Sequence, residues 1–189
     1  HFECVWEQLV DAVFGESDKE KFYPECHWFI EGKGKANLSN DFYKKYSLRP
    51  DTIMITDRGK ENQKIFILDS KYYKYGVSKF DYDLPGTGSI VKQFAYAEYV
   101  ENAPPSLPRE VRNSLNKNEI YNAFILPGKS EAGSKLHYFG YSYADYKNET
   151  EKSYSKIYGI LLDIKSIMYK HIPKDKMLIE ELTNLITKN

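Results

Sequence analysis

A short apolar strand that ends abruptly in charged residues constrains this chain more than any other feature. Ile65-Phe66-Ile67-Leu68 is wholly apolar, as expected for a strand inside a sheet, and Asp69-Ser70-Lys71 follows at once. Upstream, Thr52–Thr56 has a period near two, and Asp57-Arg58-Gly59 opens a turn between the two segments. The two strands are therefore predicted to form a hairpin, which brings the start of the first strand beside the end of the second.

The rest of the pattern predicts helices around further strands. Helical periods indicate four helices: residues 2–14, the segment from a Ser89 cap to the prolines at 103–108, 157–168 and 178–186. Further strands are predicted at 120–126 and 136–143, and exposed loops at 31–40 and 72–88. This order predicts an α/β fold, with a central mixed β-sheet flanked by α-helices on both faces.

Length and composition exclude several classes of protein. The 189 residues suffice to bury a sizeable core in one domain. No run approaches the roughly 18–20 consecutive apolar residues that span a bilayer, so no membrane segment is expected. Two cysteines are too few for a disulfide scaffold and suit a reducing, cytoplasmic compartment. Because the chain opens at His1 without an initiator methionine, it is expected to be a fragment or a subunit of a larger system.

The net charge of zero conceals two segments of opposite sign. Residues 1–25 carry seven acids against two lysines, whereas residues 58–79 carry six basic residues against two acids, with tyrosines beside several of the lysines. Aromatic residues interleaved with cations suit a nucleic-acid groove. The alternative is that the tyrosines fill strands and the lysines form a solvated face, and composition leaves both interpretations open.

The hairpin is predicted to gather charged groups at one end of the sheet. Asp69 and Lys71 lie two residues apart on a strand, so they should project to the same side, and Asp51 begins the neighbouring strand after Pro50. Converging carboxylates repel unless a cation lies between them, and oxygen ligands select Mg²⁺ or Mn²⁺. A lysine there can orient or deprotonate water. The alternative for such a motif is a pair of solvated strand ends, which occurs often by chance.

These residues resemble the signature of a known superfamily. Arg49-Pro50-Asp51 followed by Phe66-Ile67-Leu68-Asp69-Ser70-Lys71 is similar to the motif of the PD-(D/E)XK nucleases, which have the restriction-endonuclease-like fold. The resemblance implies that Asp51 and Asp69 bind a divalent metal, that the carbonyl of Ser70 adds a ligand, and that Lys71 positions the attacking water.

The same resemblance implies two further residues on helices. Many members supply a glutamate from the first helix, and here Glu7 is the candidate, with Glu3 one turn earlier as its competitor. Many also carry a glutamine on the helix after the signature, for which Gln93 is the candidate. In one branch a tyrosine follows at the fourth position, whereas Tyr96 here stands at the third, which puts the role of Tyr96 in doubt.

Within the superfamily, residues 1–100 look most like the LlaJI-type restriction endonucleases, which are related to the McrC nuclease subunits that work with a GTP-driven motor. The cleavage domain of FokI-like enzymes is a second resemblance. Both imply one nuclease domain over residues 1–189, with a type II restriction-like activity in host defence. A homodimer, or a motor or specificity subunit, is the implied partner, because breaking a duplex takes two active sites.

The sequence therefore predicts a Mg²⁺-dependent endonuclease of double-stranded DNA, in which Mn²⁺ substitutes for Mg²⁺. Tyr73, Lys74 and Lys79 follow the signature strand directly and are predicted to contact DNA phosphates. The segment Gly32–Lys35 is expected to be an ordinary basic loop, with a backbone-phosphate contact as its alternative. The competing function is a nuclease-derived module that binds DNA or a protein without cleavage.

Overall fold

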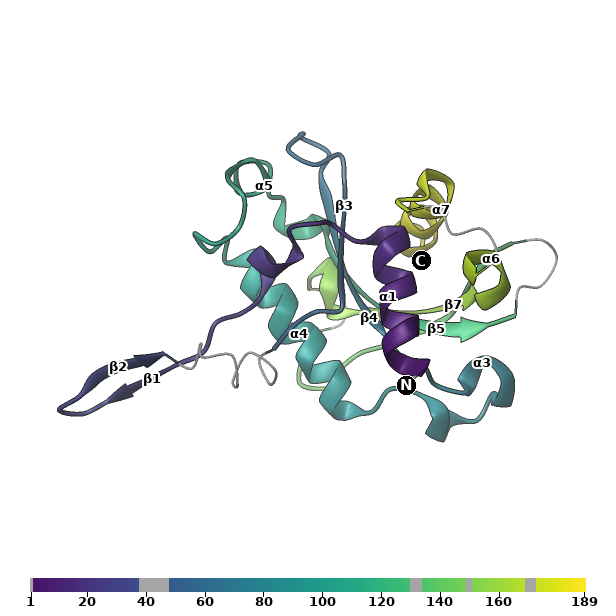
Figure 1. Ribbon diagram of the computed structural model, residues 1–189, viewed down its shortest axis with the longest axis horizontal. Coiled ribbons are helices and arrows are strands. Elements are labelled where there is room, and N and C mark those ends of the chain that lie inside the picture. The colour runs from purple at the N-terminus through teal and green to yellow at the C-terminus, as the bar shows by residue number, and fades with distance from the viewer. Residues whose placement is uncertain (1, 38–47, 130–133, 149–150, 169–172) are drawn as a thin grey trace.

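The computed structural model describes residues 2–37, 48–129, 134–148, 151–168 and 173–189 (Figure 1). Its α-helices are α1 (Phe2–Phe14), α3 (Tyr75–Ser78), α4 (Thr87–Glu101), α5 (Arg109–Asn113), α6 (Ile164–Met168) and α7 (Lys176–Thr187). The strands are β1 (His27–Ile30), β2 (Gly34–Asn37), β3 (Thr52–Thr56), β4 (Lys64–Ser70), β5 (Ile120–Gly128), β6 (Leu136–Ser142) and β7 (Ile157–Asp163). Short 3-10 helices cover Lys19–Phe22, Asp81–Asp83, Lys117–Glu119 and Ser153–Ser155.

A mixed five-stranded sheet forms the centre, in the order β3-β4-β5-β7-β6. The three middle strands are parallel, and the two edge strands run antiparallel to their neighbours. The predicted hairpin of β3 and β4 is confirmed, with Thr52 opposite Leu68. Because pairing stops there, Asp51 and Asp69 emerge at the same end of the two strands. The predicted fold class, a mixed sheet between helices, is also confirmed.

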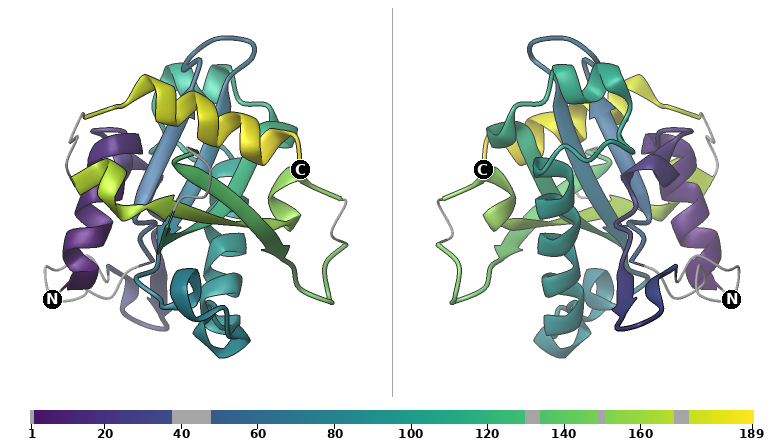
Figure 2. Two further views of the ribbon diagram at one scale, coloured as in Figure 1. Left: turned by 90° about the vertical axis from the view of Figure 1, so that its right-hand side faces the viewer. Right: turned by 90° about the vertical axis from the view of Figure 1, so that its left-hand side faces the viewer.

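Helices cover both faces of this sheet (Figure 2). Side chains of α1, α6 and α7 form one core with alternate strand residues, among them Phe66 and Leu68 of β4. Side chains of α4 and α5 form the second core with the intervening residues, among them Ile65 and Ile67. This alternation follows from the two-residue period of a strand, and it explains why β4 is apolar at every position from Ile65 to Leu68. In the described part of the chain, no helix combines the length and apolarity needed to cross a bilayer.

The predicted helix over residues 157–168 is wrong, because Ile157–Asp163 is strand β7 and only Ile164–Met168 is helical. The spacing of Ile157, Ile160, Leu161 and Ile164 also fits a helix. However, β7 lies between β5 and β6 with six consecutive buried residues, so both of its faces are apolar. A continuous apolar run cannot be assigned by its period alone. Gly159, unfavourable inside a helix, was the available signal.

Two predicted loops contain regular structure. Within 31–40, residues Gly34–Asn37 form β2 and pair with β1, while 38–40 lie outside the described residues. Within 72–88, α3 and the 3-10 helix Asp81–Asp83 interrupt the chain, and α4 begins at Thr87 behind a Gly86 cap rather than at Ser89. Elements of three or four residues are too short to display a period, so pattern analysis misses them.

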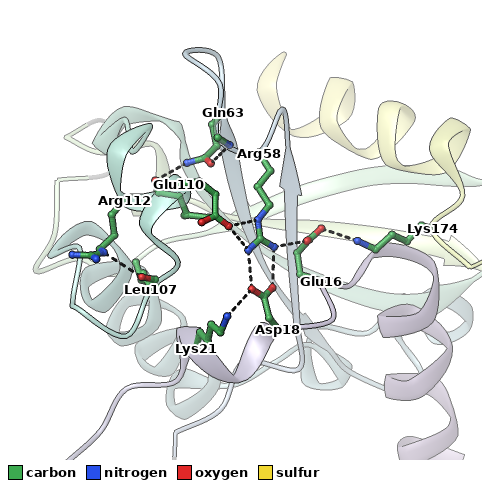
Figure 3. Close-up of polar contacts among 11 residues, drawn as sticks. Glu16, Asp18, Lys21, Arg58, Gln63, Leu107, Glu110, Arg112 and Lys174 are labelled. Atoms are coloured by element: carbon green, nitrogen blue, oxygen red, sulfur yellow. Dashed lines mark hydrogen bonds and ion pairs between the residues drawn. The ribbon is translucent and has the colours of Figure 1, made fainter.

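Much of the predicted charge separation cancels in the folded chain (Figure 3). Arg58, at the tip of the β3–β4 hairpin, donates hydrogen bonds to Glu16 at 2.8 Å, to Asp18 at 2.7 and 2.9 Å, and to Glu110 at 2.9 Å. The hydrogen bond from Arg58 lowers the pKa of Asp18 to about 2. Lys174 reaches the other oxygen of Glu16 at 3.1 Å. Arg58 therefore joins the segment after α1, the hairpin tip, α5 and the segment before α7, and does not contribute to a basic groove.

Arg58→Ala should lower the free energy of unfolding by about 1–3 kcal/mol, because Glu16 and Asp18 are mostly shielded and lose a charged hydrogen-bond donor. Urea denaturation of the two proteins measures the difference. Lys60→Ala is the matched control on the same turn: its side chain is 69% exposed and pairs with Asp57 at 3.2 Å, so it should cost less than about 0.5 kcal/mol. Equal effects of the two substitutions would contradict the assigned role of Arg58.

Candidate active site

A pocket of about 450 Å³ lies where β3 begins and β4 ends. Its wall mixes both signs of charge. The acids are Glu7, Asp11, Asp51 and Asp69, and the bases are Lys19, Arg49, Lys71 and Lys92. Gln8, Tyr23, Leu48, Pro50, Ser89 and Tyr96 complete the lining. The pocket is thus built from α1, the 3-10 helix Lys19–Phe22 with Tyr23 at its end, the approach to β3, the end of β4 and one side of α4.

Two short contacts bring the signature residues together. The backbone N–H of Ser70 donates to the carboxylate of Asp51 at 2.8 Å. The Lys71 ammonium lies 2.6 Å from the Asp69 carboxylate. The two aspartates and the lysine therefore share one end of the hairpin and one pocket, as the strand pattern predicts. Asp69 is only 7% exposed, so it lies in the pocket floor rather than at a solvated strand end.

The carbonyl of Ile125, on β5, fixes the position of two parts of the site. It accepts a hydrogen bond from the Lys71 backbone N–H at 3.0 Å and another from the Trp6 indole at 3.1 Å. Trp6 is 1% exposed, so it anchors the first half of α1 in the core. Glu7 follows Trp6 and faces the pocket. Glu3 is exposed and does not line it, so Glu7 is the helix carboxylate that the structure brings to the site.

The segment before β3 is held from two sides. Lys19 donates to the backbone carbonyl of Asp51 at 2.6 Å and pairs with the Asp11 carboxylate at 2.7 Å. Tyr96 donates its hydroxyl proton to the carbonyl of Arg49 at 3.1 Å. Tyr96 thus positions the backbone that carries Asp51, a role for which its displaced spacing gave no indication.

Two acids of the pocket, Asp51 and Glu7, lie in an environment that disfavours their charge. Burial raises the pKa of Asp51 to about 7, and the neighbouring charge of Asp69 adds to the effect, against the opposing influence of Lys71 and the Ser70 N–H. Burial likewise raises the pKa of Glu7. Burial alone would lower the pKa of Lys71, but the charge and hydrogen bond of Asp69 outweigh it and raise this pKa overall. Lys71 is therefore a protonated donor in this state.

A divalent cation fits the chemistry of this pocket. Within the described residues, no three His, Cys, Asp or Glu side chains are grouped so as to hold a metal ion. Mg²⁺ does not need such a group, because it keeps several waters and is commonly held by one or two carboxylates. Asp51 and Asp69 supply hard oxygen donors, and burial and the charge of Asp69 raise the cost of ionising Asp51, which a cation would relieve. The carbonyl of Ser70 and the carboxylate of Glu7 are further oxygen donors beside them.

Gln93 does not line the pocket. It lies on the face of α4 that also carries Ala97 and Val100, and it is fully buried. Neither polar atom of its amide has a hydrogen-bond partner among the described residues. The pocket face of α4 instead presents Ser89, Lys92 and Tyr96. Their spacing of three and four residues puts them on one side of a helix. Once one of them is assigned to the pocket, helical periodicity therefore predicts the other two.

Tyr73, Lys74 and Lys79 also lie outside the pocket lining. Lys74 precedes α3 and Lys79 follows it, and both are exposed. The Lys79 ammonium lies 5.6 Å from the ring centre of Tyr75. The helix is packed closely on the end of β5, where Gly76 leaves no room for a Cβ atom against the carbonyl of Pro127. These cations therefore stand beside the end of β4, adjoining the site but not within it.

The sequence of the chain matches one known family. No curated protein and no solved structure matches the chain. The LlaJI restriction endonuclease family, in contrast, matches residues 1–147, a span that includes every residue of the pocket wall. This agrees with the resemblance of the Arg-Pro-Asp and Leu-Asp-Ser-Lys segments. The chain belongs to the LlaJI restriction endonuclease family.

Proposed function

We propose that this protein is a Mg²⁺-dependent endonuclease that hydrolyses phosphodiester bonds in double-stranded DNA as part of a restriction system. The carrying observation is the convergence of Asp51, Asp69 and Lys71 in one pocket, with the Ser70 N–H on Asp51 and the Lys71 ammonium on Asp69. Membership of a restriction endonuclease family supports this proposal. Mn²⁺ is expected to replace Mg²⁺, since both accept oxygen ligands.

Each residue has a distinct task in this proposal. Asp51 and Asp69 hold the cation, assisted by the Ser70 carbonyl and by Glu7. A cation bound there would polarise a phosphoryl oxygen and ease the ionisation of a bound water. Lys71, as an ammonium, orients the attacking water and offsets negative charge on the phosphate. Lys92 is exposed on the pocket wall without an ion-pair partner in the described part of the chain, and it contacts the phosphate in place of Gln93.

Two breaks in a duplex usually use two active sites, so a homodimer, or a complex with a motor or specificity subunit, is the proposed assembly. Tyr73, Lys74 and Lys79 are proposed to contact phosphates flanking the pocket. Incubation of the protein with supercoiled plasmid and Mg²⁺ tests the main proposal directly, and nicked or linear product is expected. Plasmid that stays intact while the protein binds it would favour the non-cleaving module instead.

Lys71→Ala should lower the rate of cleavage at least about a hundredfold, because the pocket loses its ammonium donor. Asp69→Asn should do the same while preserving the shape of the floor. Lys64→Ala is the matched control: Lys64 begins β4, the strand that Lys71 directly follows, is about equally exposed, and pairs with Glu119 at 2.6 Å at the far end of that strand. Plasmid cleavage measures the activity of each variant, and circular dichroism measures whether it is folded. Normal cutting by the Lys71 variant would refute its role.

Two glutamates one turn apart on α1 allow a second paired comparison. Glu7→Gln should reduce cleavage by roughly tenfold or more and weaken Mg²⁺ binding, because it removes a carboxylate from the pocket wall. Glu3→Gln should leave both unchanged, since Glu3 is exposed outside the pocket. The Mg²⁺ concentration giving half-maximal cleavage is the measurement. A larger effect at Glu3 would reverse the assignment.

Stability should depend on pH through Asp51, whose pKa is raised by burial to about 7. Because its pKa is raised on folding, the Asp51 carboxyl binds its proton more tightly in the folded state than in the unfolded state. Protonated Asp51 therefore stabilises the fold at low pH, and this stabilisation is lost as pH rises from about 4 to about 7. Mg²⁺ requires the ionised form, so its stabilisation should be greater at pH 8 than at about pH 6. Melting temperatures in EDTA and in Mg²⁺ measure both trends. Asp51→Asn should flatten them; a pH-independent Mg²⁺ effect in the wild type would argue against Asp51 as a ligand.

A further inference from the structure

Lys19 lies in the wall of the pocket, but its ammonium is bound to the protein itself. It donates to the backbone carbonyl of Asp51 at 2.6 Å and lies 2.7 Å from the carboxylate of Asp11. A lysine in such a wall is expected to contact a phosphate, as proposed above for Lys92. An ammonium has three donors, and two of those of Lys19 already have short partners, one of which carries the opposite charge. These contacts indicate a different task for Lys19.

The segment that carries Lys19 is anchored on both sides. Before it, the N–H of Glu16 donates to the carbonyl of Ile53, on β3, at 2.8 Å. After it, Phe22 ends the same 3-10 helix and is fully buried in the core that α4 shares with the sheet. Because both neighbours are anchored, Lys19 is a fixed point, and its hydrogen bond ties the backbone of Asp51 to that point.

Asp11 holds the ammonium of Lys19 in this position. Asp11 lies in the last turn of α1, directly over Gly15, where a Cβ atom would collide with both the carboxylate and the carbonyl of Asp11. The glycine therefore lets the chain turn closely past the carboxylate and return to Lys19. The two side chains of the pair are only 26% and 30% exposed, so water and salt screen their attraction less than they screen a surface pair.

We propose that Lys19 and Asp11 form a positioning pair that sets the affinity of the pocket for its divalent cation. The inference rests on the proposed function, in which Asp51 is a ligand of that cation. Lys19 holds the backbone of Asp51 while the N–H of Ser70 holds its carboxylate at 2.8 Å, so the ligand is aligned from both ends. Asp11 keeps the ammonium away from the pocket carboxylates, where it would compete with the cation. Residues that orient a ligand in this way commonly change metal affinity by 10- to 100-fold when they are replaced.

The binding of Mn²⁺ without DNA, followed by the electron paramagnetic resonance of the free ion, tests this directly. Lys19→Met removes a positive charge beside acids, so electrostatic attraction alone predicts tighter binding of the cation. The positioning role predicts the opposite sign, a loss of about tenfold in affinity. Unchanged or tighter binding by the folded variant, with folding checked by circular dichroism, would overturn the proposal. A wild-type protein that binds no Mn²⁺ would instead overturn the cation site of the proposed function, and this inference with it.

Lys21→Met is the matched control for charge. Lys21 lies on the same 3-10 helix, is 49% exposed, pairs with Asp18 at 3.5 Å and does not line the pocket, so its replacement should leave Mn²⁺ affinity unchanged. An equal loss of affinity in this variant would show that Lys19 has no special role.

A double-mutant cycle tests whether Asp11 acts through Lys19. Asp11→Ala alone should weaken Mn²⁺ binding about tenfold, whereas the same substitution added to Lys19→Met should change it less than about twofold. Two independent acid and base effects would instead multiply. A fully multiplicative result would therefore refute the pairing.

Duplex binding in EDTA separates this positioning role from a contact with DNA. Lys92→Met should weaken binding and reduce the slope of log affinity against log salt concentration by about one, because one phosphate contact is lost. Lys19→Met should leave both quantities unchanged. In cleavage, it should raise the Mg²⁺ concentration that gives half-maximal activity and preserve kcat at saturating Mg²⁺. A change of salt slope in Lys19→Met like that in Lys92→Met would mean that Lys19 contacts phosphate, and the proposal would be wrong.

Discussion

The hydrogen bond from the Ser70 backbone to the Asp51 carboxylate is the contact on which the site depends. It joins the residue before β3 to the last residue of β4, just beyond the ladder that the two strands share. Its geometry follows from the register of the hairpin, and the register follows from burial of β4 on both faces. A slip of one residue would exchange the two cores and turn Asp69 and Lys71 to the other side of the sheet. The arrangement of the pocket is therefore a consequence of apolar packing.

Around that contact, three further polar groups bind the backbone of the site rather than its carboxylates and ammonium. The Ile125 carbonyl receives both the Lys71 N–H and the Trp6 indole, so β5 sets the distance between α1 and the end of β4. Lys19 and Tyr96 hold the carbonyls of Asp51 and Arg49. Buried and partly buried hydrogen bonds of this kind make the pocket rigid, which suits a site that gathers like charges. The raised pKa values of Asp51 and Glu7 reflect the cost of that gathering.

The hairpin, the first helix and the signature residues could be predicted from sequence because each has a strong local pattern. Ile65–Leu68 followed by Asp69-Ser70-Lys71 was enough to identify the strand and its functional end, and the family resemblance was confirmed. The differences have physical causes. β7 is apolar on both faces, so its period is ambiguous. A motif indicates Gln93 without specifying the helical phase, and in the structure that phase turns Gln93 into the core. Lys19 contacts the site through a fold that no local pattern specifies, 32 residues from Asp51.

The position of β7 has a consequence for how the protein is made. This strand, residues 157–163, lies between β5 and β6, both of which precede it in the chain. Until it is inserted, β5 and β6 each present an unpaired edge, and α1 lacks the helices of the C-terminal segment that share its core. A nascent chain that already contains every residue of the pocket wall therefore still has an incomplete sheet. The sheet that carries the pocket is thus completed by a strand that lies far beyond the pocket residues in the chain.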